Sequence, residues 1–383
     1  MIIGVDARVL MDKNYSGVSE YAANLLAALL DMDEMNEYRL YYNSWHDLSA
    51  RFKAWERPNV KIIKTNYPNK VFNYVLQKIC KYPKLDRLVG GCDTFFSPHL
   101  NFSRLSAGQK SILTVHDLSF LRYPEFFSGR KNFWHRTLGL KSLLNSFSHL
   151  VAVSTSTRAD LVELLQVDPE KVTIIHSGIN KPNLNFENNL ATTYLKQIGI
   201  NEPYILYLGN LEPRKNIDGL IEAYNIYRAT NPNRHDCLVL AGAVAWKTKS
   251  ILEAYRNSPY KSDIKITGYI TEQQKTYLYV RAGLFVYPSF YEGFGFPPLE
   301  AMSYGVPVVC SNVSSLPEIV AGAALTIDPY NIASLAEAMS QMIESPELLS
   351  QFTRVGKEQA AKFDWQETAK VYLSLFESLF KHP

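Results

Sequence analysis

The sequence has little of what marks several classes of protein. It holds only 4 cysteines, at positions 80, 92, 237 and 310, with no C-x-x-C pair, which argues against a zinc site or a disulfide framework and favours a reducing, cytoplasmic compartment. No window approaches the roughly 20 apolar residues of a membrane-spanning helix. The N-terminus, MIIGVDARVL, has no basic segment before an apolar one, so no secretory signal is expected.

Two common nucleotide-binding motifs are also missing. No G-x-G-x-x-G follows the first apolar run, and G-x-x-x-x-G-K-[ST] occurs nowhere, which argues against an NAD dehydrogenase and a P-loop NTPase. The net charge is only +3, so a nucleic-acid partner is not expected without a clustered basic face. We also see no cluster of acidic residues with metal-ligand spacing, and no metal site is expected.

What the sequence does have is a regular alternation of short apolar runs and amphipathic segments. The runs are short enough to be buried parallel strands, and the segments between them have helical periodicity. In the first half the predicted strands are 2–5, 40–42, 60–63, 112–115, 150–153 and 172–175. This alternation favours a doubly wound α/β fold.

A second series of the same kind follows a polar stretch, KPNLNFENN, at 181–189. Its predicted strands are 204–208, 237–241, 264–267, 284–287, 306–310 and 324–327. At roughly 100–200 residues per domain, 383 residues suit two domains. We place them at 1–184 and 185–364, and we expect a C-terminal helix in 365–383 to cross back onto the first domain.

Two doubly wound sheets that face each other would form a deep cleft at the carboxyl ends of their strands, where open α/β sheets bind ligands. The stretch YEGFGFPPLE follows a predicted strand and places seven residues between Glu292 and Glu300. Gly293 and Gly295 would let the backbone approach a ligand closely, and Pro297 suits a helix's first turn. We expect Glu300 in that first turn, where a carboxylate could accept two hydrogen bonds from a vicinal diol.

A second motif, YILYLGNLEPRKNI, joins a predicted strand to a helix. The strand ends at Gly209, and Arg214 and Lys215 lie in the loop before the helix. Two adjacent cations at such a junction can bind a diphosphate. Taken alone, the pattern is equally that of two solvated charges, but together with the glycine-rich motif it favours a nucleotide site.

Three weaker signals also lie where predicted strands end. Gly17, in SGVSEY, opens the first helix; His116, in VHDL, follows the strand 112–115; and Tyr269 and Ile270, in GYI, follow the strand 264–267. Each has an ordinary structural explanation as a turn or a packed side chain. At the mouth of one cleft, His116 could instead exchange hydrogen bonds with hydroxyl groups, and Tyr269 could pack on a nucleobase.

In this order, the motifs resemble those of the retaining GT-B glycosyltransferases of family 4, over the whole chain and most strongly in its second half. The segments that carry the resemblance are SGVSEY, VHDL, GNLEPRKNI, GYI, YPSFYEGFGFPPLEAMSYGVPVVCSN and SLPEIV. The chain looks most like the mannosyltransferase-like members that build bacterial surface polysaccharides. The resemblance implies a GT-B fold of two Rossmann-like domains and a retaining, metal-independent hexosyltransferase with no cofactor besides its nucleotide-sugar donor.

The resemblance also implies a role for each matched residue. Lys215 and Arg214 would bind the donor diphosphate, Glu300 the ribose diol and Gly17 the donor phosphates. Glu292 and His116 would face the transferred sugar, and its hydroxyls would meet the backbone of Gly293, Phe294 and Gly295. Many members carry an arginine after the glycine numbered 209 here, whereas this chain has Asn210, so that one of two usual phosphate-binding cations is missing.

Several alternatives stay open on the sequence alone. The donor is GDP-mannose or a UDP-sugar, and the same fold could serve a non-catalytic nucleotide-sugar sensor, a phosphorylase or an epimerase. The expected acceptor is a glycan or a lipid-linked sugar. The stretch 69–88 carries four lysines and an arginine among aromatic and aliphatic residues, which fits either peripheral contact with an anionic membrane or an ordinary surface helix.

Overall fold

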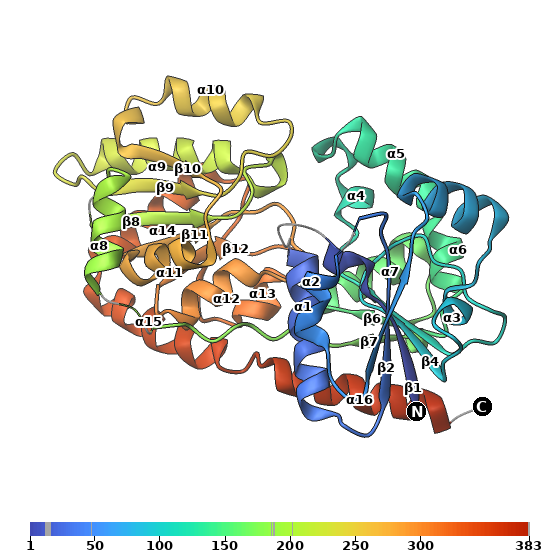
Figure 1. Ribbon diagram of the computed structural model, residues 1–383. Helices are drawn as coiled ribbons and strands as arrows, with labels where there is room; N and C mark the ends of the chain where they lie inside the picture. Colours follow the sequence, from blue (N-terminus) through green and yellow to red (C-terminus); the bar gives the residue numbers. More distant parts are fainter. Residues whose placement is uncertain (12–16, 47, 185, 187, 201, 382–383) are drawn as a thin grey trace. The chain divides into compact units, whose positions relative to one another are not determined.

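The computed structural model describes residues 1–11, 17–46, 48–184, 186, 188–200 and 202–381. These residues group into two compact units (Figure 1). Unit 1 contains Met1–Leu121, Arg130–Gly178 and Asp364–Pro383, and unit 2 contains Arg122–Gly129 and Ile179–Phe363. The sequence placed the division at 184/185 and gave no sign that 122–129 packs with the second unit.

Unit 1 is built on a parallel sheet of seven strands in the order β3-β2-β1-β4-β5-β6-β7. Its strands are β1 (Ile2–Asp6), β2 (Glu37–Asn43), β3 (Val60–Thr65), β4 (Thr94–Ser97), β5 (Ser111–Val115), β6 (His149–Ala152) and β7 (Val172–Ile174). Its helices are η1 (Ala7–Met11), α1 (Gly17–Met32), α2 (Ser49–Phe52), η2 (Lys53–Trp55), η3 (Val71–Cys80), α3 (Leu85–Leu88), α4 (Ser119–Arg122), α5 (Gly129–Leu138), α6 (Leu140–Asn145), α7 (Thr155–Leu165), η5 (Pro169–Lys171) and α16 (Trp365–Lys381).

Unit 2 repeats the plan with six parallel strands in the order β10-β9-β8-β11-β12-β13. They are β8 (Tyr204–Leu208), β9 (Cys237–Ala241), β10 (Ile264–Gly268), β11 (Leu284–Tyr287), β12 (Val308–Ser311) and β13 (Leu325–Ile327). Its helices are η4 (Pro124–Phe126), α8 (Asn188–Gln197), η6 (Pro213–Lys215), α9 (Ile217–Thr230), α10 (Lys249–Asn257), η7 (Lys261–Asp263), α11 (Glu272–Arg281), α12 (Phe296–Ser303), α13 (Leu316–Val320), α14 (Ile332–Glu344) and α15 (Pro346–Ala360).

Both sheets have the strand order of the doubly wound dinucleotide-binding fold, which confirms the predicted fold class. The central strands are mostly apolar because helices cover both faces of each sheet. In β8 and β9, for example, nearly every side chain is buried. In each sheet the chain reverses its direction of winding beside the first strand, between β1 and β4 in unit 1 and between β8 and β11 in unit 2.

The sequence missed β4, a central strand of unit 1. Its four residues, TFFS, are all buried, but they begin and end with a hydroxyl side chain, so no apolar run of the usual length marks them. The buried hydroxyl of Ser97 is satisfied within the unit, because it donates a hydrogen bond to the carbonyl of His99. The strand pairs with β1 on one side and β5 on the other, and it is therefore fixed by its neighbours rather than by its own composition.

The last helix, α16, packs against α1 within unit 1, as the red and blue ribbons of Figure 1 show. Three buried hydroxyl groups join it to the unit: the hydroxyl of Tyr372 lies 2.6 Å from that of Tyr21 and 2.8 Å from that of Thr114. Phe376 adds an edge-on contact with Phe96 on β4. A segment from the far end of the chain thus completes the core of the first unit.

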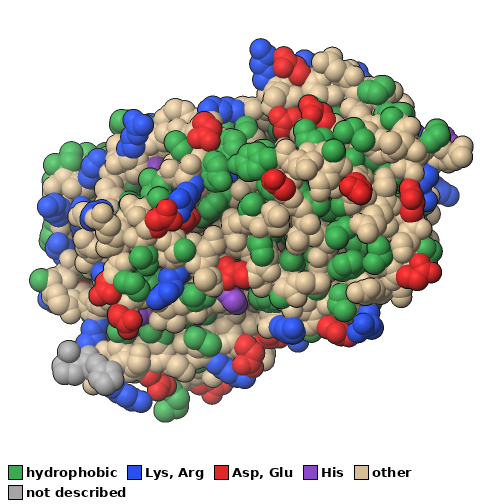
Figure 2. Space-filling view, turned by 180° about the vertical axis from the view of Figure 1, so that it is seen from behind, with side chains coloured by type: hydrophobic (Ala, Val, Ile, Leu, Met, Phe, Trp, Pro, Cys, Tyr) green, Lys and Arg blue, Asp and Glu red, His purple; other side chains and the backbone are tan. Residues whose placement is uncertain are grey.

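The surface carries charges of both signs. On the face that Figure 2 shows, blue Lys and Arg side chains and red Asp and Glu side chains are interspersed among apolar and uncharged ones, as expected for a net charge of +3. No helix among the described residues is both long and apolar enough to cross a membrane.

Candidate active site

The strongest candidate site of unit 2 lies where β8 and β11 run side by side, the point at which its strand order reverses. Open α/β sheets bind ligands at the carboxyl ends of strands at this point. Lys215 follows β8 and Glu292 follows β11. The sequence therefore delivers a cation and an anion to one edge of the sheet from positions 77 residues apart.

Lys215 ends η6, a single turn that starts with Pro213 and stops at Asn216 in the left-handed conformation, with φ of 55°. Only 8% of the lysine is exposed. Its ammonium group donates hydrogen bonds of 2.6 Å to the hydroxyl of Tyr287 and 2.6 Å to Oε1 of Glu292. Burial and the neighbouring Arg214 lower the pKa of Lys215, while Glu292 acts in the opposite direction.

Arg214 holds the other oxygen of the same carboxylate. Its guanidinium lies 3.0 Å from Oε2 of Glu292 and 2.9 Å from Oε1 of Glu212, and it donates to the carbonyl of Tyr291. Burial alone would raise the pKa of Glu292, but Arg214 and Lys215 outweigh it and hold that pKa at about 2. Glu292 is therefore ionised at neutral pH, between two cations.

The loop that carries Glu292 is fixed by two serines that the sequence did not single out. The hydroxyl of Ser314 accepts a 2.9 Å hydrogen bond from the backbone N–H of Glu292, and the hydroxyl of Ser315 reaches the carbonyls of Glu292 and Phe294. Ser315 begins SLPEIV, one of the segments that carry the family resemblance, and Ser314 directly precedes it, but no role was predicted for either serine. Gly293, Phe294 and Gly295 are buried in this loop.

Gly295 ends the loop with φ of 115°, a conformation that favours glycine. A Cβ atom there would come within 2.8 Å of Cδ2 of Leu316, so that the leucine side chain would have to shift. The helix α12 then begins at Phe296, with Pro297 in its first turn as predicted. The expectation that Glu300 lies in the first turn is wrong, because the helix already starts at Phe296 and Glu300 falls in its second turn.

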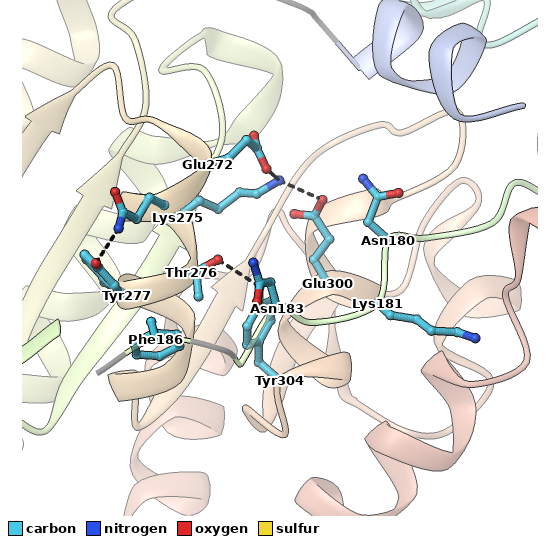
Figure 3. Close-up of a pocket in the computed structure, with 11 residues that line it drawn as sticks. Asn180, Lys181, Asn183, Phe186, Glu272, Lys275, Thr276, Tyr277, Glu300 and Tyr304 are labelled. Atoms are coloured by element: carbon cyan, nitrogen blue, oxygen red, sulfur yellow. Dashed lines mark hydrogen bonds and ion pairs between the residues drawn. The ribbon is translucent and has the colours of Figure 1, made fainter. Parts of the chain in front are cut away.

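Glu300 is held by two residues of α11. The ammonium group of Lys275 lies 3.2 Å from Oε1 of Glu300 and 2.9 Å from Oε2 of Glu272, and the hydroxyl of Tyr279 donates to Oε2 of Glu300. Figure 3 shows the Lys275 side chain reaching from α11 between the two carboxylates. Neither Lys275 nor Tyr279 was predicted, since nothing local in the sequence connects them to α12.

Glu300, Lys275 and Glu272 border a cavity with a volume of about 360 Å³. Its wall is formed by α11, α12 and the segment that leads into unit 2, and its lining residues include Asn180, Asn183, Thr276, Tyr277 and Tyr304 (Figure 3). Glu300 stands on one side of it. The cavity thus offers carboxylate, amide and hydroxyl groups to a ligand that Glu300 contacts.

The remaining predicted residues of unit 2 also follow strands. Gly209, with φ of 151°, ends β8, and its carbonyl lies so close to Gly242 that a Cβ at Gly242 would collide with it. Asn210 is exposed. Tyr269 follows β10 and is 63% exposed, and Ile270 is half-buried. These positions leave backbone accessible after β8 and an aromatic ring accessible after β10, two strands that β9 separates in the sheet.

In unit 1, Gly17 is the first residue of α1, and a Cβ on it would meet nothing within 4 Å; Ser16, quoted with it above, lies outside the described residues. His116 follows β5. Its Nε2 donates a 2.8 Å hydrogen bond to the carbonyl of Pro98, and its ring meets Tyr21 edge-on at 4.6 Å. Burial lowers the pKa of His116, so the ring is neutral at pH 7 and Nδ1 is left as an acceptor.

Unit 1 also holds a polar group that the sequence did not reveal. Asp6 ends β1 and forms a fully buried ion pair of 2.6 Å with Arg8, which also donates to the carbonyl of Phe102 and the hydroxyl of Ser103. His99 follows the neighbouring strand β4, and burial lowers its pKa to about 4. These side chains lie at the reversal point of the first sheet, and the only signal for them was the polar DAR directly after the first strand.

A short strap from the first half of the chain, residues 122–129, packs on unit 2 beside the glycine-rich loop. The indole N–H of Trp246 donates a 2.8 Å hydrogen bond to the carbonyl of Phe126. The ring of Phe126 stacks on Phe290 at 5.6 Å, and that of Tyr123 meets Tyr291 at 6.0 Å. The strap therefore supports the two residues that directly precede Glu292.

Comparison with known proteins agrees with this arrangement. Residues 15–181 match the family described as Glycosyltransferase Family 4, and residues 192–359 match Glycosyl transferases group 1. The chain is 31% identical over 287 residues to O-antigen chain mannosyltransferase B of Escherichia coli, covering 74% of this chain and 73% of the relative. It is 27% identical over 277 residues to the serotype-specific mannosyltransferase WbdA of E. coli, covering 71% of this chain but only 34% of that longer protein.

The fold is also that of solved structures. The crystal structure of Anabaena Alr3699/HepE in complex with UDP and glucose superposes with a TM-score of 0.70 at 16% identity, covering 98% of this chain and 99% of the other. The two parallel sheets and the sequence matches together define a GT-B glycosyltransferase. The chain belongs to the group 1 and family 4 glycosyltransferases, and its relatives include O-antigen mannosyltransferases.

Proposed function

We propose that this glycosyltransferase moves mannose from GDP-mannose to a hydroxyl of a growing surface glycan, with retention of the anomeric configuration. The observation that carries the proposal is the ion cluster of Arg214, Lys215 and Glu292 at the reversal point of the second sheet. The relatives, which include mannosyltransferases of O-antigen chains, support the sugar and the acceptor class.

In this proposal, Lys215 and Arg214 bind the donor diphosphate and stabilise the charge that develops on it as the bond to the anomeric carbon breaks. Glu292 exchanges one or both cations for hydroxyl groups of the sugar when the donor binds. Glu300 accepts hydrogen bonds from the ribose diol. For unit 1, we assign Gly17 to the donor phosphates and the acceptor Nδ1 of His116 to a hydrogen bond from a sugar hydroxyl.

The transfer breaks the bond between the anomeric carbon and the phosphate oxygen and forms a bond from that carbon to the acceptor oxygen on the same face. The acceptor's hydroxyl proton passes to the departing phosphate oxygen, so that no protein base is consumed. No residue in this scheme requires a metal ion, because Lys215 and Arg214 supply the positive charge.

The first experiment identifies the donor. Thermal unfolding is followed with GDP, UDP, GDP-mannose and UDP-glucose, since a ligand that binds only the folded state raises Tm. We expect the guanosine compounds to raise Tm of the wild type and to raise it less in Lys215→Ala. A shift with the uridine compounds alone would replace GDP-mannose by the alternative donor, a UDP-sugar.

A second experiment tests the reaction class. Release of free nucleotide from the donor is measured with and without a mannose-terminated acceptor, and the product's anomeric proton is examined by NMR. Acceptor-dependent release with an α-linked product is expected for an α-linked donor. Turnover with no acceptor, or exchange with free phosphate, would instead identify an epimerase or a phosphorylase, and binding with no turnover would identify a sensor.

A further inference from the structure

The helix η3 of unit 1 presents an unusual surface, which we call the η3 face. It consists of the exposed apolar side chains of Val71, Val75, Ile79 and Tyr82 and the cationic side chains of Lys70, Lys78, Lys81 and Lys84. η3 is a π-helix, and Val71, Val75 and Ile79 are spaced by four residues, which is close to one of its turns, so they lie along one side of it. Their exposed fractions are 43%, 42% and 71%, and that of Tyr82 is 68%.

The opposite side of η3 is fastened to the core of unit 1. Phe72 is fully buried in a cluster with Tyr41, Leu85, Val89 and Phe95. Gln77 is buried and donates a 2.7 Å hydrogen bond to the carbonyl of Pro83, while its own side-chain oxygen accepts from the backbone N–H of Arg104. The η3 face is therefore held in a fixed orientation, and its apolar side chains remain outside although the helix has a core to pack on.

The charge of this segment has one sign on its surface. Between 69 and 88 the sequence has four lysines, one arginine and a single acidic residue, Asp86. Asp86 is only 2% exposed, and its carboxylate accepts a hydrogen bond from the backbone N–H of Ser106. None of the four lysines forms an ion pair with another described residue. Within 69–88, the exposed charges beside the apolar side chains of the η3 face are thus all positive.

From these contacts we propose that the η3 face docks on the surface of an anionic phospholipid bilayer. Aliphatic and tyrosine side chains enter the boundary between headgroups and acyl chains, and lysines around them contact anionic headgroups. A nucleic acid would satisfy the lysines but leave the apolar row in water. The inference deepens the proposed function, because a bilayer is where a lipid-linked glycan acceptor is found.

The experiment is co-sedimentation of the full chain with vesicles of phosphatidylcholine alone or mixed with phosphatidylglycerol. We expect binding to the mixed vesicles only, and weaker binding at high salt because charges are screened. Reversing two charges in K78E/K81E should lower the vesicle affinity by at least about tenfold, on the scale of one lysine contact each. Val75→Glu should also lower the vesicle affinity, because the apolar side chain at this position would no longer enter the bilayer.

Matched controls come from the same unit. Lys53→Glu changes an exposed lysine, and Val371→Glu an exposed valine of α16 that is 46% exposed, both outside the η3 face. Neither should change binding to vesicles. Equal binding of K78E/K81E and wild type, an equal loss in the controls, or no binding of wild type to anionic vesicles would each overturn the proposal.

A local probe shows whether η3 itself meets the lipid. Cys80 is exposed at the end of η3, whereas Cys237 and Cys310 are buried and burial raises the pKa of Cys92 to about 12, so a thiol-reactive environment-sensitive dye reacts first at Cys80. Its emission should shift to the blue with anionic vesicles and not with phosphatidylcholine alone. If the labelled protein sediments with anionic vesicles but the emission of its dye does not change, the contact lies elsewhere and the inference is refuted. Nucleotide-induced shifts in Tm, measured in parallel, report the proposed function separately.

Discussion

The ammonium nitrogen of Lys215 lies 2.6 Å from Oε1 of Glu292, and the guanidinium of Arg214 lies 3.0 Å from the other oxygen of that carboxylate. The two cations are thus neutralised by Glu292 and by Glu212. A diphosphate that binds here must take over at least one of these ion pairs. Binding of the donor and release of Glu292 toward the sugar are therefore one event in the proposed mechanism.

Replacing Lys215 by alanine should lower the transfer rate by about 100-fold or more, the scale of losing one preorganised electrostatic stabiliser. Steady-state kinetics with the donor identified above measure it. The loss should appear in kcat, because the charge on the leaving group grows in the transition state. Lys249→Ala, which changes a lysine 89% exposed in its side chain, is the control and should leave kcat unchanged. Near-normal turnover of Lys215→Ala would remove its proposed role.

Replacing Glu300 by alanine should raise the donor KM, because the ribose diol loses its acceptor. A donor with 2′-deoxyribose makes the test specific. The deoxy donor should bind more weakly than the ribose donor to wild type, and the difference should shrink or vanish in Glu300→Ala. If the variant still discriminates between the two donors as the wild type does, Glu300 does not contact the ribose.

The ionisation of Glu292 predicts how stability depends on pH. Its pKa of about 2 in the folded chain lies below the ordinary value of 4.5, so its charge stabilises the fold above about pH 4.5, and this contribution is lost as the pH falls toward 2. Wild type should therefore be more stable than Glu292→Gln at neutral pH, and the gap should narrow as the medium becomes acidic. Urea denaturation at pH 7, about pH 5 and about pH 4 measures this gap; a gap independent of pH would contradict the assignment.

The strap gives a prediction about the support of the glycine-rich loop. Trp246→Phe keeps an aromatic ring but removes the hydrogen bond to the carbonyl of Phe126, which should lower the free energy of unfolding by about 1 kcal/mol. Urea denaturation followed by circular dichroism measures the change. Trp45→Phe, at a tryptophan that is 70% exposed, is the matched control and should be within about 0.5 kcal/mol of wild type.

The fold was readable from the sequence because most central strands, though not β4, are apolar runs between helical segments. The run 204–208, for instance, is β8 to the residue. Glu292, Arg214 and Lys215 were readable for a related reason: they stand directly after such runs, and the strand order brings those positions to one edge. The roles assigned to them, to Glu300, to Gly17 and to His116 stay predictions.

What the sequence did not reveal depends on contacts between distant segments. The strap at 122–129 joins Trp246 across about 120 positions, and no local pattern pairs them. Lys275 stands at a helical position with no feature that distinguishes it from other surface lysines until α11 is placed beside α12. The starting point of α12 was misjudged because Phe296 looked like part of the glycine-rich loop, whereas the left-handed Gly295 already starts the helix.

Two of the four places where the chain passes between the units, 178/179 and 363/364, adjoin each other at Gly178. A Cβ atom there would collide with the backbone of Asp364 and Trp365, the hydroxyl of Thr368 donates to the carbonyl of His176, and the N–H of Ile179 donates to the carbonyl of Phe363. A chimera that exchanges unit 2 with that of a relative must therefore cut at both of these crossings, in addition to 121/122 and 129/130 if residues 122–129 are exchanged as well. A chimera that takes the last helix from the wrong parent would bring a foreign α16 to the α1 surface, and any residue larger than glycine at 178 would wedge the paired crossings apart.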